Sequence, residues 1–326
     1  MGVRSGVRAG QVVSEGVRVT WAVVVPSCRP DRLETFKRAW SPLFRRHNAV
    51  LYVVEDQPPW DGIPDFIPKR TDMIRSWGFY QAWRDGHKYT LSLDDDVLPI
   101  HGIDIFQRYE DEFHKLHPFT SYLDVGSLTS CQLRMRGFPA REGAPAIVQY
   151  GGWDGVPDLG GQTQIDFPVD NNRFERVVVP VPVGSATTCC AMNFAFRTEF
   201  TEIMWQLPLV GGLFNRWGDI WSGLVQKAVL DSTRAGVMLI NGKASVLHER
   251  ASDPFANRDK EAPGLDPNES VWGDFLALHR ATGRGSRVRD QFEKVTYTLG
   301  WKLWGHDGDA WREYKRCRDE WRRLFD

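Results

Sequence analysis

Three consecutive aspartates, Asp94-Asp95-Asp96, follow a stretch at residues 88–93 whose alternating sequence is typical of a β-strand. Adjacent carboxylates repel one another, so a fold tolerates three of them at a strand end where a cation relieves the repulsion. Hard divalent cations prefer carboxylate oxygens and carry phosphate groups with them. The triplet therefore predicts a cation site at the end of a buried strand. The alternative is a solvated acidic turn, because short motifs also occur without a function.

The chain ahead of the triplet alternates between apolar strands and amphipathic helices. We expect strands at residues 19–25, where Pro26 ends the strand, and at 49–54. Helices are expected at 32–44, capped by Asp31, and from Thr71 or Asp72 to residue 83. This order predicts an α/β fold with a parallel, doubly wound sheet. Ligands of such sheets bind beyond the carboxyl ends of the strands, so Asp56 and the triplet are expected to face one cleft.

The rest of the chain predicts further helices at 103–116, 219–230 and 309–325, and strands at 177–179, 191–196, 237–240 and 244–247. We divide the chain into a flexible tail (1–17), a main domain (18–285) and a C-terminal helical extension (286–326). The helix at 309–325 has a basic face, interpreted as solvated surface, formed by Lys315, Arg316, Arg318, Arg322 and Arg323.

Composition limits the class of protein. Of the 326 residues, 42% are hydrophobic, which is enough for a large core, and the net charge of -1 disfavours nucleic acid and anionic lipid as partners. No apolar run approaches the roughly 18 residues of a membrane span. The N-terminal segment has no apolar core of a secretory signal, and the five cysteines show no zinc or disulfide spacing. These features predict a cytoplasmic protein.

Ten short segments occur in the same order as in a known family. The sequence resembles the plant reversibly glycosylated polypeptides, which include UDP-arabinopyranose mutases, at residues 24–29, 94–96, 136–139, 141–145, 152–153, 156–158, 163–164, 190–196, 218–223 and 248–255. The resemblance covers roughly residues 20 to 262. It implies a GT-A type glycosyltransferase fold, in which a Rossmann-like nucleotide-binding half with a mixed sheet is joined to an acceptor half. It also implies a UDP-sugar donor and a divalent ion, Mn²⁺ or Mg²⁺.

The residues around the triplet suit that ligand. Asp94 and Asp96 can reach one side of a metal ion, and His248 is the candidate third ligand, because imidazole with carboxylates suits manganese. Taken alone, a single histidine is more often structural. Its place in a matched segment favours the role of ligand.

Further residues are candidates for binding the nucleotide-sugar. Arg29 and Asp56 follow the first two strands, and a carboxylate can accept the uracil imide N–H. Asp94 and Asp95 are expected at the same carboxyl-end edge of the sheet. Arg75 could reach the ribose or diphosphate, or form a salt bridge instead. Three tryptophans that could stack on a sugar or pack in the core complete the set: Trp153, Trp217 and Trp221.

Three residues are candidates for catalysis. Arg136 matches the arginine that is glycosylated in the family, and Arg141 matches a second important arginine. Guanidinium is a poor nucleophile, so both could instead clamp the diphosphate. Asp219 opens a helix after a glycine-rich loop and could act as a base, orient a hydroxyl or cap its helix.

The resemblance favours a UDP-arabinopyranose mutase, in which pyranose and furanose forms interchange without an external acceptor. One alternative is a transferase that passes the sugar to a small molecule, a glycan or a modified nucleic-acid base. Another is a non-catalytic scaffold subunit. In each case a homo-oligomer is one candidate assembly. The chain departs from the plant pattern in a shorter arginine loop, a shorter segment before the triplet and an unmatched Trp-rich C-terminal segment. The first and last of these departures favour the transferase.

Overall fold

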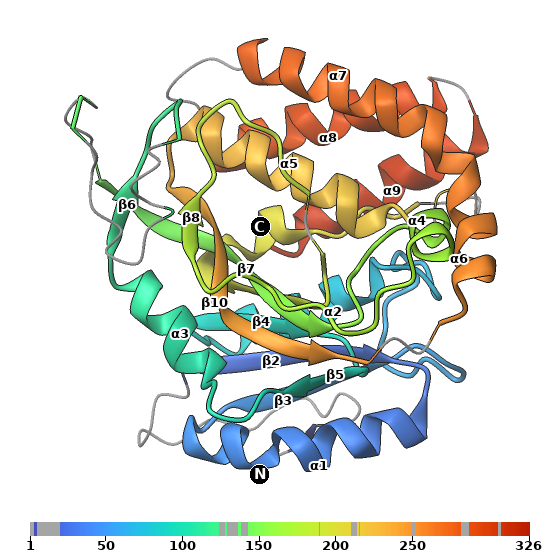
Figure 1. Cartoon of the computed structure of the whole chain (residues 1–326). Helices are drawn as coiled ribbons and strands as arrows, with labels where there is room; N and C mark the ends of the chain where they lie inside the picture. Colours follow the sequence, from blue (N-terminus) through green and yellow to red (C-terminus); the bar gives the residue numbers. More distant parts are fainter. Residues whose placement is uncertain are drawn as a thin grey trace.

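A computed structural model gives the architecture and describes residues 3–4, 20–123, 128, 136–137, 143–188, 190–209, 214, 216–249, 252–281, 287–305 and 308–326, without the side chains of 3–4 and 276–281. One twisted sheet runs through the molecule in the order β1-β3-β2-β4-β9-β7-β10-β5, with helices on both faces (Figure 1). The short strands β6 (Leu116–Pro118) and β8 (Val178–Pro180) pair with β7 and β10 outside this path.

The first half of the sheet is parallel, as the sequence predicts. β2 (Trp21–Ser27), β3 (Val50–Glu55) and β4 (Tyr89–Leu93) run in one direction, joined by α1 (Pro30–Arg46) and α2 (Ile74–Arg84). β4 is buried along its whole length and leads directly into the aspartate triplet. The carboxyl ends of β3 and β4 therefore lie at one edge, and Asp56 and Asp94 follow them there.

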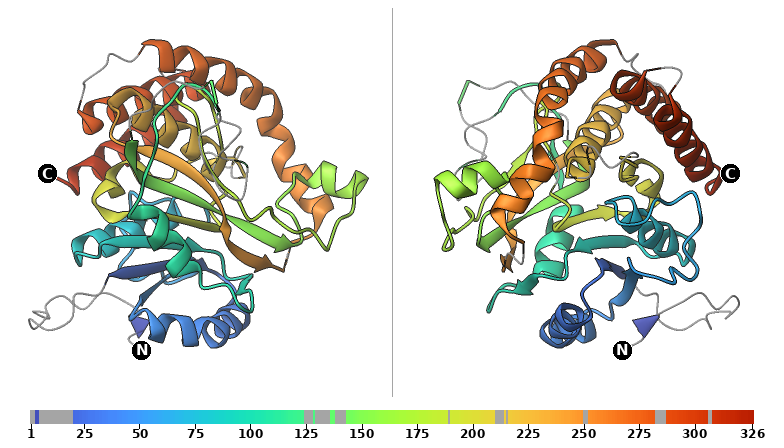
Figure 2. Two further views of the ribbon diagram at one scale, coloured as in Figure 1. Left: turned by 60° about the vertical axis from the view of Figure 1, so that its left-hand side comes forward. Right: turned by 90° about the vertical axis from the view of Figure 1, so that its right-hand side faces the viewer.

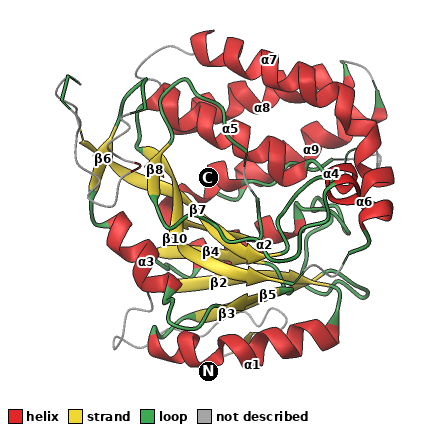
Figure 3. Ribbon diagram, viewed as in Figure 1, coloured by secondary structure: helices red, strands yellow, loops and turns green. Residues whose placement is uncertain are grey.

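The second half of the sheet is mixed (Figure 3). β9 (Asn193–Arg197) runs antiparallel to both β4 and β7 (Gly143–Gly155), and β10 (Val237–His248) runs parallel to β7. The short strand β5 (Val97–Pro99) pairs antiparallel with the end of β10. A parallel nucleotide-type half joined to a mixed half confirms the predicted α/β fold of GT-A type.

Two apolar layers hold the sheet between helices. Alternate residues of β2 face opposite ways: Val23 packs with α1 and α3 (Ile105–Phe113), whereas Val24 packs with α2 and α5 (Gly218–Thr233). This is the period-two pattern of a strand buried on both faces. The 3₁₀ segment η2 (Thr198–Met204) also lies on the second face. At the side of the molecule, α4 (Gly161–Asp166) packs against α6 (Pro254–Glu261) (Figure 2).

The C-terminal helices, expected to form an extension, are part of the main core. After the 3₁₀ turn η3 (Ala262–Gly264) come α7 (Leu265–Ala281), α8 (Val288–Trp304) and α9 (Asp309–Arg323). Trp311, Tyr314 and Trp321 of α9 are buried in the same cluster as Leu224 of α5. The basic face of α9 forms ion pairs with acidic neighbours, among them Lys315 with Asp319. The expectation of a solvated surface is wrong for Arg318, which is 3% exposed and lies over the ring of Tyr297.

Several local expectations differ from the structure. β2 continues through Pro26, because Pro26 pairs only with β3 and lies beyond the residues that pair with β4. Arg29 rather than Asp31 occupies the N-cap of α1, since Pro30 begins the helix. Val3–Arg4 forms β1 beside β3, whereas the sequence predicts a flexible tail there. In the described part of the chain, no helix is long and apolar enough to cross a membrane.

Candidate functional site

Pairing of β5 with β10 brings His248 to the aspartate triplet. His248 lies opposite Val97 in the antiparallel register, and the N–H of Glu249 donates to the carbonyl of Asp96 at 3.0 Å. Two segments far apart in the sequence are thereby fixed side by side by the backbone itself. The predicted juxtaposition of His248 with Asp96 is present in the fold.

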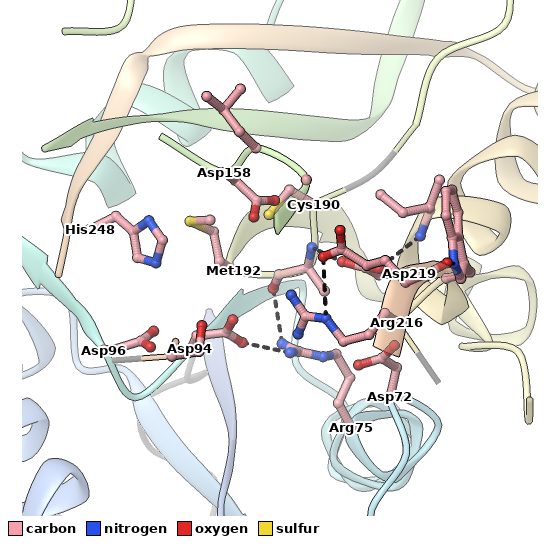
Figure 4. Close-up of a pocket in the computed structure, with 17 residues that line it drawn as sticks. Asp72, Arg75, Asp94, Asp96, Asp158, Cys190, Met192, Arg216, Asp219 and His248 are labelled. Atoms are coloured by element: carbon pink, nitrogen blue, oxygen red, sulfur yellow. Dashed lines mark hydrogen bonds and ion pairs between the residues drawn. The ribbon is translucent and has the colours of Figure 1, made fainter. Parts of the chain in front are cut away.

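A cavity of about 280 Å³ opens between these groups and the start of α5 (Figure 4). Asp94, Asp96 and His248 lie on one side of it, and Arg216 and Asp219 lie on the other. Trp217 also lines the cavity. The volume is at the small end of the range for ligand pockets. Among the described residues, the guanidinium groups of Arg75 and Arg216 line it, together with six carboxyl groups, those of Asp72, Asp94, Asp96, Asp158, Asp219 and Glu261.

A wider groove of about 950 Å³ adjoins this cavity. Arg29 and Asp56 line the groove, together with Asp95 and Arg70. The groove and the cavity share four residues: Asp72, Arg75, Asp94 and Arg216. A ligand with a large and a small part could therefore occupy both, with its junction at these four side chains.

Two arginines form ion pairs with the carboxylates of the aspartate triplet, and Arg29 is the first of them. Arg29 pairs with Asp95 and, at 3.2 Å, with Asp96, while the Ser27 hydroxyl donates to Asp95 at 2.5 Å. Asp95 is 3% exposed, so its carboxylate is used within the protein and braces the loop that follows β4. Asp94 and Asp96, on either side of it, face the cavity.

Arg75 is a buried partner of Asp94. Its Nη2 donates to Asp94 at 2.6 Å, and its Nη1 donates to the Ser92 hydroxyl at 2.6 Å and the Ala191 carbonyl at 2.9 Å. The residue is only 4% exposed. The predicted salt bridge is present, and Arg75 therefore orients Asp94 toward the cavity. Arg75 also lines both hollows, and its contact with the ribose or diphosphate stays a prediction.

Asp56 is partly engaged by its own loop. Its Oδ1 accepts from the backbone N–H of Arg70 at 2.8 Å and from the Trp60 indole at 3.4 Å. These bonds fix the carboxylate at the rim of the wide groove, where it can meet a donor group of a ligand.

His248 has the tautomer that a metal ligand needs. Its Nδ1 lies 2.6 Å from the carbonyl of Val156, so this nitrogen carries the proton and donates it. Nε2 is then the unprotonated nitrogen, and a second nitrogen bound to a backbone carbonyl is the usual arrangement of a metal-binding histidine. The excess of carboxylates in the cavity also favours a cation. The donor set therefore fits a divalent ion.

The three groups do not form a finished cage. Within the described ranges, no three side chains of His, Cys, Asp or Glu converge closely enough to hold a metal ion. Magnesium-type ions commonly take only one or two carboxylates and complete their coordination with substrate phosphates and water. The arrangement suits an ion that arrives together with a diphosphate.

Burial and mutual repulsion raise the pKa values of acidic groups in the cavity. Burial, then Asp72 and Asp158, raise the pKa of Asp219 from 3.8 to about 8. Burial and the neighbouring Asp94 raise the pKa of Asp96. Burial, then Asp158 and Asp219, raise the pKa of the Cys190 thiol well above its usual range, which makes it a poor nucleophile. At neutral pH the cavity therefore keeps a proton on Asp219.

Comparison with known proteins assigns the family. The family model described as reversibly glycosylated polypeptide matches residues 70–307. The chain belongs to this family. A probable UDP-arabinopyranose mutase 1 of Pisum sativum is 34% identical over 289 residues, which cover 78% of this chain and 77% of the relative. UDP-arabinopyranose mutase 1 of Oryza sativa subsp. japonica is 33% identical over 281 residues, covering 76% and 75% of the two chains.

Similarity to solved structures is much weaker. A Pyrobaculum calidifontis mannosyltransferase in complex with GDP-Man and Mn²⁺ shares 11% identity over 95% of this chain and 86% of its own, with a TM-score of 0.32. The catalytic domain of a Drosophila β1,4-galactosyltransferase shares 14% identity over 58% and 56%, with a TM-score of 0.27. Overlaps this loose support no argument about function.

Three of the remaining predicted residues, Trp221, Trp153 and Arg136, lie outside the lining of the cavity. Trp221 is fully buried, donates to Asn268 at 3.0 Å and packs against Trp217, so Trp217 is the ring that faces the cavity. Trp153 packs on Phe174 outside the lining. Arg136 lies in an exposed turn that lines neither hollow, and Arg141 is outside the described residues.

Four charged residues of the cavity escaped the sequence analysis, and one of them, Glu261, was not considered at all. Asp72 was considered only as a helix cap, Asp158 appeared only within a matched segment, and Arg216 was not singled out. Asp158 had one usable signal, since it is itself part of the matched family segment 156–158. Asp72 and Arg216 had none, because loop residues meet only through the tertiary fold.

Proposed function

We propose that this chain interconverts the pyranose and furanose forms of UDP-arabinose. Its family and its curated relatives, which are named UDP-arabinopyranose mutases, support the reaction class. The observation that carries the proposal is the pair of joined hollows, one wide and one small, whose shared edge consists of two aspartates and two arginines. A nucleotide fits the wide groove and a single sugar residue the small cavity.

In this proposal the uridine lies in the wide groove, where Asp56 accepts the imide N–H and Arg29 borders the ribose or diphosphate. The diphosphate lies at the shared edge. Arg216, whose side chain is 40% exposed, belongs to both hollows and can bind its oxygens. The roles of Arg136 and Arg141 as glycosylated residue or clamp remain predictions.

Asp94, Asp96 and His248 would hold Mn²⁺ or Mg²⁺ together with the diphosphate. Such an ion neutralises the leaving diphosphate when the glycosidic bond breaks. The chain's own contribution is orientation: Arg75 fixes Asp94, and Val156 fixes the ring of His248. We also propose a cytoplasmic location, which accords with the free thiols of Cys28, Cys190 and Cys317.

The test uses the purified protein with Mn²⁺ and UDP-arabinopyranose, followed by chromatography for UDP-arabinofuranose and free UDP. The proposal predicts isomer with little hydrolysis, and a loss of on the order of 100-fold in kcat/KM for Asp94→Asn. Asp170→Asn, a change of an exposed acid outside both hollows, is the matched control.

Two outcomes would contradict the proposal. Slow UDP release that quickens when a sugar or glycan acceptor is added would indicate the transferase. Tight UDP binding with neither product would indicate the scaffold.

A further inference from the structure

The small cavity has to orient a sugar that carries no charge. While UDP is detached, the nucleotide no longer serves as an anchor, so contacts with the cavity must keep the sugar in place. The carboxylates of the lining can accept hydrogen bonds from hydroxyl groups. They offer no partner to the C–H groups on the face of a sugar ring, for which ligand pockets use aromatic and apolar side chains.

Trp217 supplies a flat apolar surface in this lining. Among the described residues that line the cavity, it alone carries an indole or benzene ring. Its side chain is only partly buried, and it is not among the described residues that line the wide groove. Contact with Trp217 therefore belongs to the part of a ligand that enters the small cavity.

Three contacts fix the indole of Trp217. Its Nε1 donates to the carbonyl of Glu261 at 3.1 Å. The ring of Trp221 stacks on it, with 5.8 Å between the ring centroids and 26° between the ring planes. Gly264 packs against the five-membered ring, because a Cβ at this position would lie 2.1 Å from Nε1. The ring therefore has one preferred position before any ligand binds.

The residues that fix Trp217 are themselves held by other helices. The carboxylate of Glu261, at the end of α6, accepts from the backbone N–H of Gly161 in α4 at 2.7 Å. The indole of Trp221 donates to Asn268 of α7 at 3.0 Å. Trp221 is fully buried and serves the core, whereas Trp217 reaches the cavity. A ring that is already ordered loses little side-chain entropy when a ligand stacks on it.

From this geometry we infer that Trp217 is the stacking surface for the sugar ring and determines how tightly the cavity holds a neutral pentose. The inference rests on the proposed mutase function for the identity of that sugar. Pyranose and furanose rings both present C–H groups on a face, so one indole can support either form. Trp217 takes no part in proton transfer or bond formation; it orients the sugar while UDP is detached.

The experiment separates the sugar from the nucleotide. Calorimetry with Mn²⁺ measures the affinity for UDP and for a phosphonate analogue of UDP-arabinopyranose, in which CH₂ replaces the oxygen between C1 and phosphorus and prevents cleavage. For Trp217→Leu we expect the affinity for the analogue to fall about 10-fold and that for UDP to stay within about threefold of wild type. Trp217→Phe keeps an aromatic face and should lose no more than about threefold for either ligand. Trp301→Leu, which changes an exposed tryptophan outside the described lining of both hollows, is the matched control.

Each other outcome also decides the question. An equal loss of affinity for UDP and for the analogue in Trp217→Leu would overturn the inference, because the ring would then support the whole site. Unchanged affinity for the analogue in this variant, or an equal loss of it in Trp217→Phe, would overturn it as well. If wild type forms no UDP-arabinofuranose while Trp217→Leu still loses affinity for the analogue alone, the mutase function is refuted and the stacking surface stands.

Discussion

The protonated state of Asp219 makes the stability of the fold depend on pH. Its pKa is 3.8 in the unfolded chain and about 8 in the folded protein, because of burial and then of Asp72 and Asp158. Between these values the folded protein holds a proton that the unfolded chain has released. The stability contribution of this proton is complete below pH 4 and declines as the pH rises toward 8. Each pH unit is worth about 1.4 kcal/mol, so a rise from pH 5 to 7.5 removes about 3 kcal/mol.

Asp219→Asn abolishes this titration and isolates the effect. We expect the free energy of unfolding of the variant, relative to that of wild type, to rise by about 2–3 kcal/mol between pH 5 and 7.5. Groups that titrate alike in both proteins cancel in this difference. Urea denaturation followed by tryptophan fluorescence at pH 5, 6.25 and 7.5 measures it, with Asp170→Asn as the control. A difference between variant and wild type that stays constant across this range would refute the assigned protonation state.

Three further predictions address the fold and the cation site. Trp321→Ala removes a fully buried ring and its hydrogen bond to the Glu202 carbonyl, and should lower the free energy of unfolding in urea by about 3–5 kcal/mol. A decrease below about 1 kcal/mol would mean that α9 is a dispensable extension. Arg75→Lys cannot keep all three bonds of the guanidinium and should weaken Mn²⁺–UDP binding about 10- to 100-fold in calorimetry, and unchanged affinity would contradict its role in orienting Asp94. Removal of divalent ions with a chelator should abolish the stabilisation of wild type by UDP in thermal unfolding. His248→Gln should show little stabilisation by UDP even with Mn²⁺. Equal stabilisation of the variant and wild type with Mn²⁺ would argue against His248 as a ligand.

The nucleotide half could be predicted because its signals are local. Buried parallel strands consist of short apolar runs, and β2, β3 and β4 are of this kind. The rule that ligands bind at the carboxyl ends of parallel strands then places Asp56 and Asp94 at one edge. The boundaries were less accurate where a residue such as Pro26 is tolerated only because a neighbouring strand has ended.

The sugar end of the cavity could be predicted only in part. His248 was identified from a matched segment, but its position beside Asp96 depends on the register of β5 with β10, which no local pattern specifies. Trp221 shows the opposite difficulty, since a tryptophan near a site suits both stacking and core packing, and here it is buried. Asp72 and Arg216 lie on loops whose approach is decided by the packing of α2 against the rest of the core.

The bonds between Val156 and His248 join the two ends of the pocket. The His248 imidazole donates to the Val156 carbonyl, and the Val156 N–H donates back to the His248 carbonyl at 3.2 Å. Val156 lies two positions before Asp158 in the sequence. A ligand that immobilises the imidazole also removes freedom from the loop that carries Asp158. The first ligand therefore bears the entropic cost of ordering the loop, and the second ligand binds without that cost. This is positive cooperativity without a change of structure. Thermodynamic linkage makes the effect reciprocal: a sugar seated against Asp158 should slow the escape of an ion bound at His248.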